Sequence, residues 1–152
     1  MGWRLDPDAY KAAWDSGIGA AKSGGRWNST GIHAVYCALD PATAIIEVAV
    51  HVGFDHLDSV PRVLTSFTVL SPEKIHVVNP DDVPNPNWLR PGRPSVNQQK
   101  FGDALLADHG IFVIPSAVSS HSWNLVFRAG LPNANYSFRA QERFALDTRL
   151  AS

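Results

Sequence analysis

Three residues between Gly25 and His51 bring a cation, an aromatic ring and a carboxylate together within a short stretch of chain. Arg26 lies in a segment rich in glycine, serine and asparagine, Tyr36 in an apolar run, and Glu47 in a run of alanine, isoleucine and valine. A guanidinium group matches phosphate oxygens in bidentate fashion, and an aromatic ring offers a rigid face for a flat ligand. A carboxylate can stabilise a developing positive charge.

Each of these residues also has an ordinary structural interpretation. Glu47 could lie on the solvent-exposed face of an amphipathic helix, Tyr36 could be a half-buried aromatic residue of a strand, and Arg26 could be a surface cation or part of a structural ion pair. Taken one at a time, these interpretations are the simpler ones. The three residues together favour a functional site, in which Trp27 and Asn28 would shape the loop rather than touch a substrate.

Other familiar motifs are incomplete. Gly17 and Gly19 resemble the start of a dinucleotide-binding fingerprint, but Lys22 stands at its third glycine position. Lys22-Ser23 resembles the end of a phosphate-binding loop without its two glycines, so we expect residues 15–31 to be mostly loop. No two of the six histidines have the i,i+4 spacing of a helical zinc site, so no metal is expected. Serine–histidine–aspartate catalysis stays open, although no G-x-S-x-G elbow occurs.

The elements that carry the three residues follow from periodicity and turn chemistry. Alternation over Ile32–Leu39 predicts a strand that is buried on both faces and directs Tyr36 to one of them. Asp40-Pro41 predicts the start of a helix, and Gly53 its end. Glu47 would then lie about two turns into this helix.

The rest of the chain predicts one mixed α/β domain. Ser95 and Gln98 form a plausible capping box for a helix that ends before residue 110. Asn79–Pro94 holds five prolines and predicts a long ordered loop or lid rather than a linker. We expect His33 to be packed in the core. Further strands are predicted at Val63–Leu70, Lys74–Val78, Ile111–Ile114 and within Tyr136–Leu146.

Composition limits the function classes. The chain has 152 residues, of which 45% are hydrophobic, so it can bury a core. Its formal net charge is −1, so it has no overall positive charge that would attract nucleic acid or anionic membranes. Cys37 is the only cysteine, which excludes an intrachain disulfide. No signal peptide is visible, and the longest strongly apolar run, Ala44–Val50, is too short to cross a bilayer. We expect a soluble cytoplasmic protein.

The string from Gly25 to His51, Gly-Arg-Trp-Asn-x-x-Gly-x-x-x-Val-Tyr-x-Ala-x-x-Pro-x-x-Ala-x-x-Glu-Val-x-Val-His, resembles the signature of the RES domain. That family is named after an arginine, a glutamate and a serine, which match Arg26, Glu47 and, in Pro-Ser-Ala, Ser116.

The resemblance extends from Trp3-Arg4 to Asp147-Thr-Arg-Leu150, so it covers essentially the whole chain, residues 1–152. One departure is the run from Asn124 to Ala129, which lacks the Asn-Pro end common in the family.

The resemblance implies a single compact α/β (α+β) domain similar to ADP-ribosyltransferases of the diphtheria-toxin kind. It also implies a toxin that acts on NAD⁺ as a substrate, without a resident cofactor, and is opposed by an Xre-like helix-turn-helix antitoxin. Relatives either destroy NAD⁺ by hydrolysis or phosphorolysis, or ADP-ribosylate a protein. The acceptor, the role of the long loop, the binding mode of the antitoxin and a homodimer all stay open, as does a catalytically silent relative.

On this resemblance, Glu47 would stabilise the oxocarbenium ribose, Arg26 would bind the phosphates and Tyr36 would face the nicotinamide ring. The leaving nicotinamide is already cationic in NAD⁺ and needs no proton donor, so one carboxylate suffices. Ser116 would orient either the carboxylate or the substrate. Arg4 would be a second phosphate contact or a surface cation.

Overall fold

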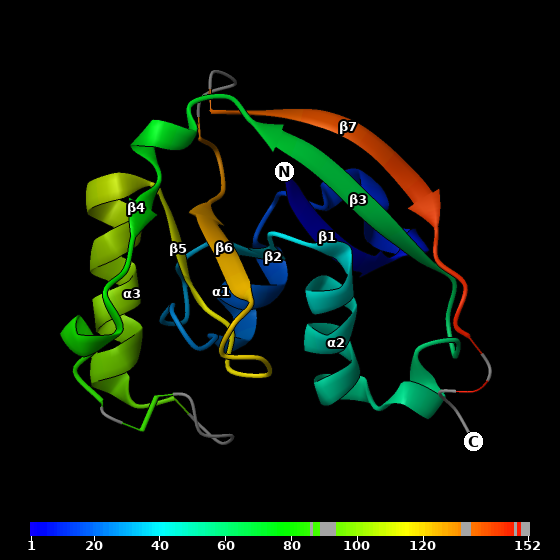
Figure 1. Cartoon of the computed structure of the whole chain (residues 1–152), viewed down its shortest axis with the longest axis horizontal. Coiled ribbons are helices and arrows are strands. Elements are labelled where there is room, and N and C mark those ends of the chain that lie inside the picture. Colours follow the sequence, from blue (N-terminus) through cyan, green and yellow to red (C-terminus); the bar gives the residue numbers. More distant parts are fainter. Residues whose placement is uncertain (86, 89–93, 132–134, 148, 150–152) are drawn as a thin grey trace.

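A seven-stranded mixed sheet organises the computed structural model, which describes residues 1–85, 87–88, 94–131, 135–147 and 149 (Figure 1). The strands are β1 (Gly2–Pro7), β2 (Ala34–Ala38), β3 (Arg62–Val69), β4 (His76–Val77), β5 (Ile111–Pro115), β6 (Trp123–Arg128) and β7 (Tyr136–Arg143). The α-helices are α1 (Ile18–Ser23), α2 (Pro41–Val52) and α3 (Val96–His109). Short 3₁₀ helices are η1 (Asp8–Ala13), η2 (Phe54–His56), η3 (Pro72–Lys74) and η4 (Pro80–Asp82).

The sheet has the strand order β4-β5-β6-β2-β1-β3-β7, with β4 and β5 parallel and every other pair antiparallel. β2 pairs with β6 along its whole length, but it pairs with β1 only at Trp3↔Ala38 within the described chain. β1 and β2 therefore separate from one another beyond the Trp3–Ala38 pair. Across the gap, Arg4 Nη1 donates a hydrogen bond of 2.8 Å to the carbonyl oxygen of Tyr36.

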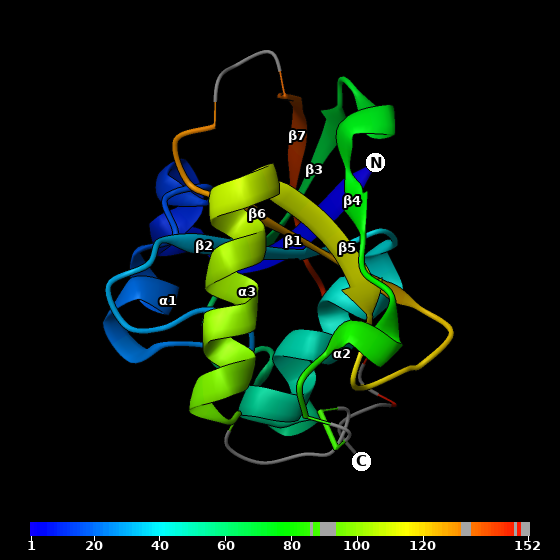
Figure 2. The ribbon, with the colours of Figure 1, turned by 90° about the vertical axis from the view of Figure 1, so that its left-hand side faces the viewer.

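Buried side chains cover both faces of the sheet. Ala34 of β2 belongs to an apolar cluster with Trp27, Leu106 and Phe112, and α3 lies across this face (Figure 2). Val35, the next residue, belongs to a second cluster that contains Trp14 just after η1. Because successive side chains of a strand point to opposite faces, β2 is buried on both sides, as its sequence predicts.

Hydrogen bonds and backbone conformation at its two ends set the bounds of α2 where the sequence predicts them. The Asp40 side chain accepts a hydrogen bond of 2.8 Å from the Thr43 backbone N–H, and the Thr43 hydroxyl donates to the same carboxylate at 2.7 Å. Gly53 ends the helix with a φ of 86°, a conformation that glycine adopts readily. Ala44 and Ala49 are buried on the inner side of the helix. The predicted helix bounds are confirmed.

Residues 15–31 are mostly loop, as predicted, with one short helix among them, and one local prediction is wrong. Residues 15–31 contain α1, whose flanking Gly17 and Gly24 have φ values of 65° and 71°. The glycines that indicated a loop delimit a short helix. His33 is exposed rather than packed in the core, and its Nδ1 lies 3.2 Å from the Ser16 carbonyl oxygen.

The second half of the chain mostly follows its prediction. The Ser95 hydroxyl accepts a hydrogen bond from Gln98 N–H and begins α3, while the Gln98 side chain bonds Asn85 instead of completing a capping box. The strand predicted over Lys74–Val78 is shorter in the structure, where it is β4 (His76–Val77), because Lys74 belongs to η3. In the described part of Asn79–Pro94, Val83 and Trp88 are buried in the core, so this part is an ordered loop. Residues 86 and 89–93 lie outside the described residues.

Candidate active site

A cavity of about 920 Å³ lies where β1 and β2 separate. Its wall includes residues of β1, α1, β2 and α2, together with the segment that precedes β2. Four of the five residues that the sequence predicts for the site lie on this wall: Arg4, Arg26, Tyr36 and Glu47. The fifth, Ser116, lies behind it and is fully buried.

Glu47 is half-buried on α2 and faces the cavity rather than bulk solvent. Its Oε1 accepts two hydrogen bonds, one from the Ser116 hydroxyl at 2.7 Å and one from Asn124 Nδ2 at 2.8 Å. No described residue donates a hydrogen bond to Oε2. The carboxylate is therefore held through one oxygen and has its other oxygen available to a ligand.

Ser116 makes its polar contacts inside the protein. Its hydroxyl donates to Glu47, and its oxygen accepts a hydrogen bond of 3.1 Å from Val118 N–H. Of the two roles that the sequence leaves open, orienting the carboxylate or touching the substrate, this geometry supplies the first.

The Tyr36 hydroxyl anchors the loop that carries Arg26. It donates a hydrogen bond of 2.6 Å to Asn28 Oδ1 and accepts one of 3.0 Å from Trp27 N–H. Burial raises the pKa of the Tyr36 phenol, so the group stays neutral. Trp27 and Asn28 are almost completely buried and hydrogen-bonded within the loop, while Trp27 also lines the cavity; that neither residue touches a substrate stays a prediction.

Arg26 joins this loop to the long segment before α3. Its Nη1 donates a hydrogen bond of 2.5 Å to the Trp88 carbonyl oxygen. The Trp88 ring packs edge-on against Trp27, with 5.3 Å between ring centroids. A guanidinium has five N–H donors, so this contact leaves further donors for an anion in the cavity.

The Arg4 guanidinium is already engaged by other groups of the protein. Its guanidinium contacts both carboxylate oxygens of Asp6 at 3.0 Å and also bonds the Tyr36 carbonyl oxygen. Burial raises the pKa of Asp6, and the Arg4 charge opposes that rise. Arg4 therefore holds the gap between β1 and β2 while also lining the cavity.

Asn124 is the site residue that the sequence analysis did not single out. It lies 77 residues from Glu47 along the chain, on β6, and it lines the cavity. Asn124 is the first residue of the run that ends at Ala129, but no local pattern of the sequence assigns it to the site.

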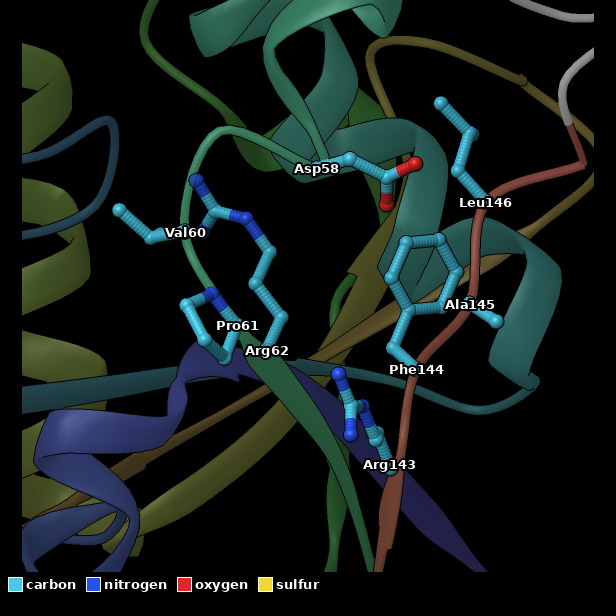
Figure 3. Close-up of a pocket in the computed structure, with 8 residues that line it drawn as sticks. All are labelled: Asp58, Val60, Pro61, Arg62, Arg143, Phe144, Ala145 and Leu146. Carbon is cyan, nitrogen blue, oxygen red and sulfur yellow. The ribbon is translucent and has the colours of Figure 1, made fainter.

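A smaller pocket of about 310 Å³ lies between the start of β3 and the end of β7 (Figure 3). Asp58, Arg62 and Arg143 contribute its charged side chains, and none of the predicted site residues lines it. Within the described chain, no group of three or more histidine, cysteine, aspartate or glutamate residues could hold a metal ion. The same residues include no helix that is long and apolar enough to span a membrane.

Comparison with known proteins identifies the family. The sequence model of the RES domain matches residues 2–147. The chain belongs to the RES domain family. It is 33% identical to Toxin Res of Photorhabdus laumondii over 97% of this chain and 95% of that protein. It is 31% identical to the Prs ADP-ribosylating toxin of a Sphingobium species, over 87% of this chain and 84% of that protein.

The fold also has a solved counterpart. A chain in the crystal structure of the M. tuberculosis MbcT–MbcA toxin–antitoxin complex superposes with a TM-score of 0.67 at 18% identity, covering 99% of this chain and 87% of that chain. The predicted RES family and the predicted mixed α/β fold class are therefore confirmed. The roles of Arg4, Arg26, Tyr36, Glu47 and Ser116 stay predictions.

Proposed function

We propose that this RES domain is the toxin of a bacterial toxin–antitoxin pair and that it cleaves NAD⁺ at the nicotinamide–ribose bond. The observation that carries the proposal is the Glu47 carboxylate. It is half-buried, tied through one oxygen and open through the other, on a cavity wall that also holds Arg26 and Tyr36. Water or phosphate would accept the ADP-ribosyl group, so the reaction would deplete NAD⁺ and arrest growth.

The chemistry requires one well-placed negative charge. Breaking the bond to nicotinamide builds positive charge on the ribose, and the departing ring leaves as a neutral base. A carboxylate about 4 Å from that charge contributes about 4 kcal/mol at an effective dielectric constant near 20. This corresponds to about a thousandfold in rate. The free Oε2 of Glu47 would supply the charge.

The cavity provides for the rest of the substrate. Its volume of about 920 Å³ lies at the upper end of the range for small-molecule sites. The Arg26 donors that bond no described residue would bind the pyrophosphate, and the Tyr36 ring would face nicotinamide. Arg4, already paired with Asp6, would add positive potential rather than a flexible clamp.

Mono-ADP-ribosylation of a cellular protein is the second candidate. The Prs ADP-ribosylating toxin, at 31% identity, favours it by name. The same Glu47 chemistry would serve both reactions, because they differ only in the acceptor. Free ADP-ribose or its 1″-phosphate would accumulate in the first case, and a labelled protein in the second.

The proposed partner is an Xre-like helix-turn-helix antitoxin that covers the cavity. The toxin–antitoxin complex among the structural neighbours supports a partner of this general kind. A homodimer and a cytoplasmic location also stay predictions.

The variant Glu47→Gln tests the proposed mechanism. The oxygen of the new amide can still accept both hydrogen bonds, but the side chain carries no charge. We therefore expect normal folding and a fall of about a thousandfold in nicotinamide release from NAD⁺. Glu142→Gln makes the same chemical change on the exposed part of β7 and should keep wild-type activity. Near-normal turnover by folded Glu47→Gln would contradict the mechanism.

A further inference from the structure

We propose that Asn124 is a positioning residue that orients the Glu47 carboxylate toward the substrate; this inference rests on the proposed function of that carboxylate. Asn124 Nδ2 lies 2.8 Å from Glu47 Oε1, and its side chain also lines the cavity. A hydrogen bond to an ionised acceptor is about twice as strong as one between neutral groups. The contact therefore has the strength to select one carboxylate orientation.

The amide of Asn124 is poorly satisfied apart from this bond. Its Oδ1 is buried and accepts no hydrogen bond from the described residues. Exchanging the amide nitrogen and oxygen would turn Oδ1 toward the negative carboxylate, so the observed orientation is the favourable one. A buried acceptor without a donor destabilises a fold, so folding alone gives no reason for an asparagine here.

The two donors that hold Glu47 lie at the end of one strand and within its neighbour in the sheet. Ser116 directly follows β5, and Asn124 lies within β6 opposite Ile114 of β5 and Ala38 of β2. Both donors reach the same oxygen, Oε1, which leaves Oε2 unengaged by the described residues. Ser116 is fully buried, so Asn124 is the one of the two donors that a substrate in the cavity would meet.

The isosteric variant Asn124→Asp tests the proposal through charge. It would put a second carboxylate 2.8 Å from Glu47 Oε1 in place of the donor. Two carboxyl groups at that distance cannot both ionise readily, so the pair should hold one shared proton to higher pH than the single carboxyl group of the wild type. The acid limb of the activity profile should move up by at least about one pH unit.

The other titratable groups on the cavity wall are the same in wild type and variant: Arg4, Asp6, Tyr10, Lys22, Arg26, Tyr36, Cys37 and His51. A shift between the two profiles therefore reports on the Asn124–Glu47 pair. Asn97→Asp makes the same substitution at an exposed position of α3 and should shift nothing.

NMR gives a readout that does not depend on catalysis. The chain has three glutamates, so ¹³C labelling of glutamate carboxyl groups yields three signals, and the signal lost in Glu47→Gln identifies Glu47. In Asn124→Asp the Glu47 signal should follow the titration of the carboxyl pair, with its final step at least about one pH unit above the wild-type midpoint, and in Asn97→Asp it should stay unchanged. An unchanged midpoint in folded Asn124→Asp would overturn the proposal.

The variant Asn124→Ala tests the proposal through enzyme kinetics. We expect kcat for NAD⁺ to fall about 10- to 100-fold with KM within about threefold, the effect of losing one hydrogen bond to a charged group. Thermal stability should not fall, because the unpartnered Oδ1 is removed as well. Wild-type kcat, or a loss of activity that only follows a loss of stability, would contradict positioning. If wild-type protein leaves NAD⁺ intact, the proposed function fails, and the NMR titration still decides the Asn124–Glu47 coupling.

Discussion

Replacing Tyr36 with phenylalanine should destabilise the protein through its loop more than through the strand. The substitution removes one hydroxyl and leaves the aromatic ring in place. Two buried groups lose their partner, the Trp27 N–H at 3.0 Å and the Asn28 Oδ1 at 2.6 Å. Each unsatisfied buried group costs about 1–3 kcal/mol, so we expect the free energy of unfolding to fall by about 2–6 kcal/mol in total.

A loss of this size is readily measured. For a domain of this length it lowers Tm by about 4–24 °C, and urea titration followed by tryptophan fluorescence gives the free energy directly. Tyr10→Phe is the matched control, because Tyr10 is 68% exposed and should change stability by less than about 0.5 kcal/mol. If Tyr36→Phe unfolds within about 0.5 kcal/mol of wild type, the hydroxyl does not anchor the Arg26 loop and the reasoning fails.

Four further predictions concern the elements that hold the site. Asp40→Ala removes the N-cap of α2 and should lower the free energy of unfolding by about 1–2 kcal/mol in urea titration; no loss would show that the cap is dispensable. Gly102→Ala would drive a methyl group into the Trp27 carbonyl and should cost about 1–3 kcal/mol by the same measurement. Gly19→Ala, with no atom within 4 Å of the added carbon, should stabilise α1 by about 0.5–1 kcal/mol, and equal effects of the two glycine variants would contradict the packing. Burial raises the pKa of the Cys37 thiol from 9.0 to about 12, so a thiol reagent at pH 8 should label it only as the protein unfolds. Because the folded pKa is the higher one, the thiol's contribution to stability is present below about pH 9 and is lost as pH rises toward 12; rapid labelling of folded protein would contradict this.

Local sequence signals located the elements whose ends are chemically marked. Asp40-Pro41 and Gly53 gave both ends of α2, and Ser95 gave the start of α3, because capping depends on neighbouring residues. β1 and β6 were not predicted. β1 pairs with β3 from a distant part of the chain, and β6 pairs with the distant β2 as well as with the neighbouring β5. On β1, the buried Asp6 pairs with Arg4, two residues away on the same face of the strand.

The candidate site also combines residues that a local motif predicts with residues that only the fold brings together. Arg26, Tyr36 and Glu47 lie within one motif, and the structure places all three on one cavity wall. The two donors to Glu47 come from residues 69 and 77 positions away, so their convergence depends on the order of β5, β6 and β2 in the sheet. No local pattern carries that information, which is why the bond from Asn124 could not be predicted.

The most direct test of the account is to incubate antitoxin-free protein with NAD⁺, with and without phosphate, and to follow nicotinamide release beside Glu47→Gln. We expect wild-type protein to release nicotinamide and to form ADP-ribose, or its 1″-phosphate when phosphate is the acceptor, while folded Glu47→Gln is slower by about a thousandfold. No release by folded wild-type protein, or equal release by the two proteins, would contradict NAD⁺ cleavage at Glu47.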